Sequence, residues 1–505
     1  MADTIHSTPQ MPDDADSAVG IVIGSVGVLL LLASLDQTIV STALPTIVAD
    51  LGGLDHLSWV VTAYILASTV VAPLYGKIGD LYGRRNTVLF SVVLFLVGSA
   101  LCGLATSMPF LIAARALQGL GGGGLFVLAL SIIGDVIPPK DRGKVQGMFA
   151  GVFGISSVAG PLLGGWFVDA FSWHLIFYIN IPFGLLALAG FFYGFKAHPD
   201  PVPHKIDYAG AVALTVTLGA TVLVTALGGQ EFAWNSVPAL ALFGLAITAL
   251  IAFILIELRA AEPILPLSLF KMNVFWTTSL ISFVSGAMMF GSLTFIPAFL
   301  QLAKGATATA SGLQLIPMTV GILTASTLSG RYMGRTGKYR SLPIIGLIIA
   351  VGGLLILTRL SPQMPAPLLW LALIMIGAGM GTVFPVVTTA VQNAVPREQL
   401  GTATAAGLMF RQVGGSIAVA LFGAIFAARL TSLTGDIPLG GLASVAELGP
   451  QSMAHLPEQA RDLIATSVGQ ALHPVYWIAA ALALCGVFFA ILMKEKPLEG
   501  RMTPR

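Results

Sequence analysis

Long apolar stretches follow one another along the chain, separated by short breaks that contain charged, Pro, Gly or Asn residues. A helix needs about 20 predominantly apolar residues to cross the hydrocarbon core of a bilayer. The pattern predicts an all-α membrane protein with fourteen transmembrane helices, an even number that places both chain ends on one side. The predicted spans are residues 19–45, 57–76, 87–106, 110–134, 145–168, 175–195, 207–227, 237–257, 274–301, 310–330, 341–360, 367–391, 402–427 and 474–493.

The composition of the 505 residues supports this prediction, because 56% are apolar and only 10% are charged. Soluble proteins carry about 25% charged residues. A net charge of +2 without a basic run argues against nucleic acid as a partner. The two cysteines lie far apart and the seven histidines are scattered, so no disulfide framework, metal site or catalytic cluster is expected. No G-x-x-x-x-G-K-S/T segment for ATP is present, and the sequence predicts neither an enzyme nor a cofactor.

Most of the 25 Lys and Arg residues fall in the loops that share a side with the chain ends. Cytoplasmic loops of membrane proteins carry this excess of positive charge. Residues 1–17 hold several Asp and no Lys or Arg, which is the wrong charge for a signal peptide. We therefore expect a multi-pass protein of the cell membrane with both termini cytoplasmic and its first apolar segment retained.

Asp36 is the only carboxylate set deep within an apolar span. An ionisable group at that depth costs roughly 2.5–3.5 kcal/mol on insertion scales, so it indicates a functional site. At 1.5 Å per residue, Asp36 lies roughly 24 Å from the inner edge of span one, and Arg115 roughly 8 Å from the outer edge of span four. In a hydrocarbon core about 30 Å thick, the two side chains lie at comparable depth.

These depths lead to the hypothesis that Asp36 binds a proton or a cationic substrate, one at a time, with Arg115 as its electrostatic partner. Burial favours the neutral carboxyl group and a nearby arginine favours the charged one, so the group can load and unload. The alternative is a structural pair that only clamps two helices together. Gln37, Gln118 and Arg411 are expected to support the cavity and the coupling, and helix packing or gating is favoured for Arg411 over direct substrate contact.

The segment between the second and third predicted spans contains glycines and charges suited to a gate. Its glycines permit a tight reversal of the chain, and Asp80 and Arg84, four residues apart, can pair with each other or interact with a helix end. We predict that this segment latches the cytoplasmic side in one conformation and does not contact cargo. The gate residues are Gly76, Asp80, Gly83, Arg84 and Arg85.

Spans four and five are rich in glycine. Gly119, Gly121 and Gly124 spell G-x-G-x-x-G, but no strand precedes them, so close helix packing is expected and nucleotide binding is not. A second set in span five could form a kink, or it could bias the protein toward export. This set comprises Gly160, Pro161, Gly164 and Gly165.

Together with residues 377–381, 390–396 and 410–416, these segments resemble the major facilitator superfamily, and within it the fourteen-span drug:proton antiporter family. The resemblance implies two six-helix bundles around a central cavity, with spans seven and eight as an inserted pair. It also implies that the motif at Gly160 and Pro161 marks exporters that exchange substrate for protons. The segment 330–335 echoes the gate but lacks its Asp, so the inner gate is expected to be asymmetric.

On this basis we expect five parts. These are a cytoplasmic tail (1–18), an N-terminal six-helix bundle (19–195), two inserted transmembrane helices with cytoplasmic linkers (196–273), a C-terminal six-helix bundle (274–493) with a long outer loop (428–473), and a second cytoplasmic tail (494–505). Within the outer loop, residues 456–464 have the pattern of a short amphipathic helix lying outside the membrane or at its interface.

The function expected from these features is proton-coupled export of drugs or other lipophilic or cationic small molecules by alternating access, by a monomer. The alternative is a proton-coupled uptake or export carrier for a specific metabolite. Aromatic residues could line a cavity for flat lipophilic cations, although contact with lipid is the commoner use of any one of them. The candidates are Tyr64, Phe153, Phe290, Phe295 and Phe299.

Overall fold

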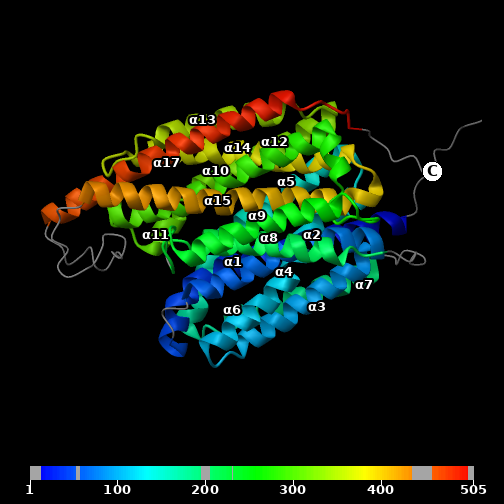
Figure 1. The fold of residues 1–505 in the computed structure, drawn as a ribbon, viewed down its shortest axis with the longest axis horizontal. Helices are drawn as coiled ribbons and strands as arrows, with labels where there is room; N and C mark the ends of the chain where they lie inside the picture. Colours follow the sequence, from blue (N-terminus) through cyan, green and yellow to red (C-terminus); the bar gives the residue numbers. More distant parts are fainter. Residues whose placement is uncertain (1–12, 53–56, 195–204, 230, 435–457, 499–505) are drawn as a thin grey trace, which may run out of the picture.

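Long α-helices form the fold and run roughly along the longest axis of the molecule (Figure 1). The computed structural model describes residues 13–52, 57–194, 205–229, 231–434 and 458–498. The β-structure in these residues is one isolated bridge between Gly228 and Phe232, so the predicted all-α class is confirmed. The N-terminal bundle consists of α1 (Asp13–Leu51), α2 (Leu57–Tyr82), α3 (Arg84–Gly103), α4 (Met108–Val136), α5 (Pro139–Ala170), α6 (Leu175–Tyr178) and α7 (Asn180–Gly194).

A second bundle follows an inserted pair of helices. The inserted pair is α8 (Tyr208–Leu227) and α9 (Val237–Glu257). The C-terminal bundle consists of η2 (Leu267–Lys271), α10 (Asn273–Lys304), α11 (Ala308–Leu313), α12 (Ile316–Thr336), α13 (Ser341–Leu357), α14 (Ala366–Ala394), η3 (Arg397–Gln399), α15 (Leu400–Thr434) and α17 (Glu458–Leu492).

Every predicted span coincides with helical structure, with α6 and α7 forming one span and α11 and α12 another. Twelve spans in the described residues are long and apolar enough to cross a membrane. The helix α5 is not among them, and α13 is apolar but has only 17 residues. The class of multi-pass membrane protein is thus established, whereas the count of fourteen stays a prediction.

The predicted outer loop 428–473 is shorter in the structure, because helices enter it from both sides. α15 continues to Thr434, and α17 begins at Glu458 and runs without interruption to Leu492. The expectation of a separate amphipathic helix at 456–464 is therefore wrong from Glu458 onward, where the residues form the first turns of α17. Residues 435–457 lie outside the described residues, as do 1–12 and 499–505 of the two predicted tails.

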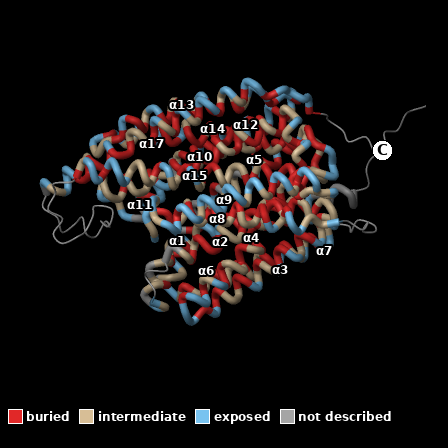
Figure 2. Tube along the Cα trace, in the orientation of Figure 1, coloured by how far each residue is buried: buried red, intermediate tan, exposed pale blue. Residues whose placement is uncertain are grey.

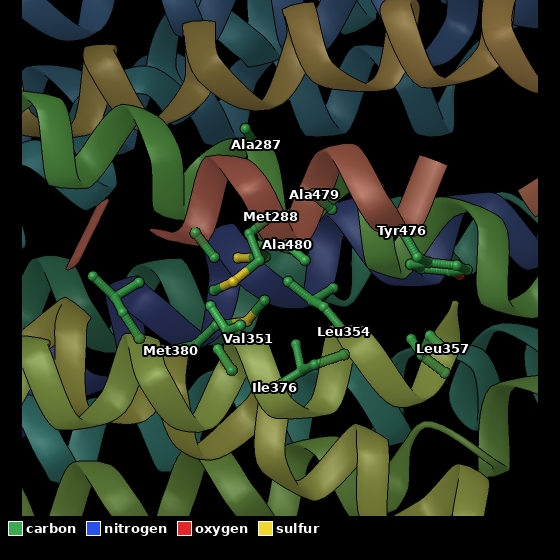
Figure 3. Packing of buried hydrophobic residues seen from close by; sticks show 14 of the residues in the cluster. Ala287, Met288, Val351, Leu354, Leu357, Ile376, Met380, Tyr476, Ala479 and Ala480 are labelled. Carbon is green, nitrogen blue, oxygen red and sulfur yellow. The ribbon is translucent and has the colours of Figure 1, made fainter. Parts of the chain in front are cut away.

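Each bundle has its own apolar core. In the C-terminal bundle, side chains from α10, α13, α14 and α17 interlock, with Met288, Leu354 and Ile376 fully buried (Figure 3). In the N-terminal bundle, Leu29 and Leu128 belong to a separate core. Burial is concentrated along the inner sides of the helices, and exposed residues follow their outer sides (Figure 2). Two separate cores are what two bundles need in order to move against each other as units.

The inserted helices pack unequally. α8 contacts both α2 and α15, one helix from each bundle, and Leu218 of α8 shares a core cluster with Val70 and Ala406. A hydroxyl–hydroxyl hydrogen bond also joins Thr225 of α8 to Ser416 of α15. By contrast, only 11% of the apolar stretch of α9 is buried inside the protein. α8 therefore covers one seam between the bundles, and the apolar surface of α9 suits contact with lipid.

One face of the molecule collects the ends of α2, α4, α12 and α17 and the starts of α3, α5 and α13. The described C-terminal end of the chain also lies there (Figure 1). We call it the basic face, because its turns carry most of the loop cations, among them Arg84, Lys140, Lys338 and Arg340. The turn between α2 and α3 depends on Gly83, whose φ of 90° lies in the left-handed region that other residues avoid.

Glycine packing within the N-terminal bundle generates a stability prediction. A Cβ atom at Gly121 would lie 2.2 Å from the backbone nitrogen of Phe95 on α3, and a backbone cannot swing aside as a side chain can. We expect Gly121→Ala to destabilise the protein by about 1–3 kcal/mol through overpacking, measured as a lower melting temperature in detergent. Gly244→Ala on α9, with nothing within 4 Å of the added Cβ, is the control. Equal melting temperatures for the two variants would contradict the packing role.

Candidate functional site: a buried ion pair, a latch and a central cavity

Asp36 and Arg115 form an ion pair inside the N-terminal bundle, as their comparable depth predicted. Arg115 donates from Nη1 to Oδ2 of Asp36 at 2.7 Å. The Asp36 side chain has no exposed surface and that of Arg115 has 2%, so both charges are removed from water. Burying two charges is favourable only when each finds good partners, and the surrounding residues supply them.

Four more polar groups complete the network. Gln118 donates to Oδ1 of Asp36 at 2.8 Å, and its own Oε1 accepts from Arg115 at 2.6 Å. Asn180, the first residue of α7, donates to the same Oδ1 at 3.1 Å and to Oγ of Ser99 at 2.9 Å. The backbone carbonyl of Val60 accepts from Nε of Arg115 at 3.3 Å. The carboxylate is thus held by donors from α4 and α7, which fix its position at the centre of the bundle.

Asn180 and Ser99 were missed by the sequence reasoning. Asn180 was not among the predicted site residues, yet it contacts the central carboxylate. The detectable signal was an amide side chain at the start of an apolar span, since a buried amide needs partners. Ser99 gave no such signal, because serine is common in membrane helices.

Tyr64 of α2 separates this network from the central cavity. Its ring centroid lies 4.3 Å from Cζ of Arg115, in cation–π geometry. The residue is 1% exposed and also lines the cavity. Gly122 accommodates the phenol, because a Cβ at that position would lie 2.5 Å from the tyrosine oxygen. One aromatic ring therefore stands between the ion pair and the space where a small molecule can bind.

The predicted motif in α5 positions the part of α1 that carries Asp36. A Cβ at Gly160 would lie 2.1 Å from Oγ1 of Thr38, and one at Gly164 would lie 2.2 Å from Oγ1 of Thr42. Thr38 in addition donates to the carbonyl of Ser156 at 3.0 Å. Gly165 has nothing within 4 Å of an added Cβ. Gly160 and Gly164 thus allow α1 and α5 to touch, and α5 is a continuous helix through Pro161.

The opposite side of α5 packs against α12 of the other bundle. A Cβ at Gly330 would lie 2.3 Å from the carbonyl oxygen of Gly143, and one at Gly154 would lie 2.6 Å from Cγ2 of Thr319. Small residues let helix backbones approach closely in membranes. α5 therefore contacts the helix bearing Asp36 on one side and the C-terminal bundle on the other.

Asp80 joins the two bundles at the basic face. Its carboxylate accepts from the backbone N–H groups of Gly401 at 2.9 Å and Thr402 at 2.7 Å, and from the Thr402 hydroxyl at 2.8 Å. These groups lie at the start of α15, where a negative charge is stabilised by the helix dipole and by free N–H groups. The side chain also pairs with Arg84, which in turn bonds Asp135 at 2.9 Å. The latch geometry predicted for Asp80 and Arg84 is present.

Two other gate residues, Gly76 and Arg85, differ in whether they contact α15. Gly76 allows close contact with α15, because a Cβ there would lie 2.6 Å from Cβ of Ala405. Arg85 points to α7 of its own bundle, where it bonds the carbonyl of Phe192 at 3.2 Å and stacks on its ring. Arg85 therefore does not contribute to the contact between bundles in this conformation.

A cavity between the bundles encloses about 1310 Å³ of empty space, including the part open to solvent. Gln37 and Arg411 line it, whereas Gln118 lies in the ion-pair network instead. Asp36 and Arg115 are also absent from its wall. Arg411 is the only charged side chain among the described residues that line the cavity. The remaining lining residues are mostly apolar or aromatic, including Tyr64, Phe126, Phe149, Met289, Phe290 and Phe384.

The aromatic candidates divide accordingly. Tyr64 and Phe290 line the cavity, so the preference for lipid contact was wrong for them. Phe295 and Phe299 lie in the core of the C-terminal bundle, facing neither cavity nor lipid. The side chain of Phe153 lies outside the described residues. Sequence alone could not separate cavity lining, core packing and lipid contact, because a phenylalanine inside a membrane helix is compatible with all three.

Comparisons with known proteins agree with this geometry. A model of the Major Facilitator Superfamily matches residues 26–419. An uncharacterized MFS-type transporter of Mycobacterium tuberculosis is 40% identical over 470 residues, which are 93% of this chain and 68% of the relative. The multidrug transporter protein MdtP of Bacillus subtilis is 34% identical over 95% of this chain and 94% of its own length. Multidrug resistance protein 3 of the same organism is 38% identical, over 81% and 78% respectively.

Solved structures show the same fold. The human organic anion transporter MFSD10 matches with a TM-score of 0.64 at 14% identity, over 95% of this chain and 100% of that structure. The proton:xylose symporter XylE matches with a TM-score of 0.61 at 16% identity, over 96% and 98%. The family match and the transporters among the relatives place the chain with transporters and not with enzymes. The chain belongs to the major facilitator superfamily, and its relatives include proteins named as a multidrug transporter and a multidrug resistance protein.

The latch generates a conformational prediction. Asp80→Asn removes the charge that the start of α15 stabilises, an interaction of up to about 2 kcal/mol when partly buried. We expect the basic face to open more often, seen as longer distances between spin labels at positions Asn86 and Lys338, one on each bundle. Asp135→Asn is the matched control, because it removes an ion pair of Arg84 without touching α15. Unchanged distances in Asp80→Asn, or equal changes in both variants, would contradict the latch.

Proposed function

We propose that this protein is a proton-coupled antiporter that exports lipophilic or cationic small molecules across the cytoplasmic membrane by alternating access. The observation that carries the proposal is the buried pair of Asp36 and Arg115, whose helices α1 and α4 also line a mostly apolar cavity. The named relatives support the efflux direction, since two of them are a multidrug transporter and a multidrug resistance protein.

Asp36 is the proposed proton site. Proton binding would neutralise the carboxylate and leave the guanidinium of Arg115 without its counter-charge. Breaking a buried pair in this way costs about 3–5 kcal/mol when nothing else changes. The protein can relieve this cost only by moving helices or admitting water. A change of protonation at this position is therefore well suited to switch the conformation of the bundle.

α5 is the proposed route by which the switch reaches the other bundle. It contacts α1 through Gly160 and Gly164, close to Asp36, and it contacts α12 through Gly143 and Gly154. A shift of α1 against α5 would be felt at the α5–α12 seam, because tightly packed helices cannot deform independently. This gives the α5 motif a physical role in coupling that does not depend on a kink at its proline.

The direction of access follows from charge. The basic face is the cytoplasmic face if the positive-inside rule holds, and both termini are then cytoplasmic. At this face Asp80 bridges to α15, and Gln392 of α14 donates to the carbonyl of Leu130 on α4 at 3.0 Å. In this proposal these bonds hold the cavity closed toward the cytoplasm. Cargo could then not return inward in this conformation, and loading would require the latch to open.

Cargo would bind among the aromatic and aliphatic side chains of the cavity. The lining suits flat lipophilic molecules, since Tyr64, Phe290 and Phe384 contribute rings from three helices. Because Asp36 is sealed behind Tyr64, a cation cannot touch the carboxylate in this conformation. We therefore assign the proton to Asp36 and the cargo to the cavity. Proton binding would affect cargo binding indirectly, through Arg115, the ring of Tyr64 and the positions of their helices.

Uphill transport by the purified protein in sealed vesicles tests the proposal. One proton per neutral cargo at 100 mV is worth about 2.3 kcal/mol, which can sustain a cargo gradient of about fifty-fold. We expect Asp36→Asn to lose this accumulation, while exchange of labelled for unlabelled cargo at equal concentrations continues. Accumulation would be followed with a fluorescent lipophilic dye, with and without an uncoupler.

Asp141→Asn serves as the control, because Asp141 is an exposed acid at the basic face and should leave accumulation unchanged. If Asp36→Asn still concentrates dye against its gradient, the carboxylate is a structural clamp and the proton carrier lies elsewhere. Dye movement toward the basic-face side in a proton-dependent manner would instead support the competing reading, an uptake carrier.

A further inference from the structure

The positive charge of Arg411 has no counter-charge in the part of the protein that the structure describes. No ion pair or hydrogen bond joins its side chain to another described residue; its guanidinium lies 4.8 Å from the ring centroid of Phe384. An arginine at membrane depth normally faces a bundle interior and pairs with an acid or with backbone carbonyls. Arg411 instead lines the central cavity.

The long apolar stretches of the C-terminal bundle contain no acidic partner. Residues 263–397, 399–435 and 463–494 contain no Asp or Glu, and the acids Glu398, Glu458 and Asp462 lie at the ends of elements. In the N-terminal bundle, the acids within the described helix packing are already engaged. Asp36 is bonded to Arg115, Asp80 to Arg84 and α15, and Asp135 to Arg84.

Hydroxyl groups surround the space beside Arg411. A second small chamber shares Phe384, Thr388, Leu408 and Arg411 with the central cavity. Its other polar lining comes from α10 and α15 and consists of Thr278, Ser279, Ser282 and Thr404. Thr278 and Thr404 donate their hydroxyls to the backbone carbonyls of Val274 and Leu400, which leaves the hydroxyls of Ser279 and Ser282 as donors. A guanidinium with five N–H donors, next to two serine O–H donors, is a set of groups that recognises an oxyanion.

The position of Arg411 is fixed by the packing of its backbone. A Cβ at Gly286 of α10 would lie 1.9 Å from the carbonyl oxygen of Arg411, and one at Gly414 would lie 2.2 Å from that of Phe283. α10 and α15 therefore touch at this level, and the guanidinium extends from a rigid crossing point. Rigid placement reduces the entropy lost when an anion binds.

We propose that Arg411 is an anion-binding subsite of the cargo cavity, which holds a carboxylate carried by the transported molecule. The inference deepens the proposed function, because it adds a charge requirement to the lipophilic cargo. The aromatic body would lie among Tyr64, Phe290 and Phe384, and the carboxylate would reach Arg411 and the two serine hydroxyls of the adjoining chamber. Because Arg411 lies on α15, the subsite belongs to the C-terminal bundle, whereas the proposed proton site belongs to the N-terminal bundle.

A matched pair of dyes tests the subsite. A rhodamine with a free benzoic carboxylate and its methyl ester share one cationic aromatic body and differ only in the anionic group. We expect the full-length protein in nanodiscs to bind the acid at least about tenfold more tightly than the ester, measured by fluorescence anisotropy. Arg411→Gln should abolish this preference, and Arg411→Lys should retain part of it, since the charge remains but the bidentate geometry is lost.

Two control variants separate this outcome from other failures. Arg359→Gln removes an exposed arginine of the C-terminal bundle and should leave the preference intact. Asp36→Asn should also keep the preference for the acid even though it loses uphill transport, so the subsite and the proton site can fail independently. Melting temperatures identify any variant that is merely unfolded, and in that case Arg411→Lys carries the test.

The same titrations in chloride and in gluconate distinguish the source of the anion. Weaker binding of the acid in chloride, lost in Arg411→Gln, would show that the subsite also takes a small inorganic anion. Equal binding of acid and ester by the unmodified protein would overturn the proposal. So would an Arg411→Gln variant, folded normally, that weakens both dyes to the same extent.

Discussion

A carboxylate and a guanidinium enclosed in one helical bundle are the constraint on which the rest of this structure depends. Asp36 and Arg115 have no access to water, so each is tolerated only while the other is charged and in place. Gln118 of α4 and Asn180 of α7 also hold the carboxylate, and Tyr64 lies between the pair and the cavity. The packing of α1, α2, α4 and α7 therefore converges on the carboxylate of a single side chain. Breaking such a buried ion pair costs about 3–5 kcal/mol, and population shifts between two conformations need free energies of the same size.

Glycines transmit this constraint outward. The N-terminal bundle contacts α12 mainly through α5, whose glycines allow backbone contact on both of its sides. At the basic face, Asp80 adds an electrostatic contact to the start of α15. The contact between α5 and α12 is made by close packing along the helices. The contact between Asp80 and α15 is polar and confined to one helix end. A transporter built in this way can open at the latch while the seam remains in contact, so that the two ends of the cavity need not open together.

Much of this architecture is encoded in features that the sequence displays directly. The helix positions follow from apolar stretches, and the meeting of Asp36 and Arg115 follows from counting residues along two spans that enter from opposite sides. What could not be predicted depends on rotation about helix axes. Arg85 turned toward α7 instead of the latch, Phe290 turned into the cavity, and Asn180 reached the carboxylate, all through side-chain directions that spacing does not fix. The outer end of α17 was misjudged for a related reason: a polar amphipathic pattern at Glu458–Ile464 describes both an interfacial helix and the protruding end of a long one.

The inserted helix α8 has a mechanical consequence. It lies over the seam between α2 and α15 and contacts both of them, and the hydroxyl pair of Thr225 and Ser416 joins it to the C-terminal side. If the bundles rock, α8 can follow only one of them, and its contacts with the other must slide or break. The opposite seam, between α5 and α12, has no such cover among the described helices. Resistance to rocking is therefore unequal on the two flanks, and the flank covered by α8 also carries α9, which packs against α8.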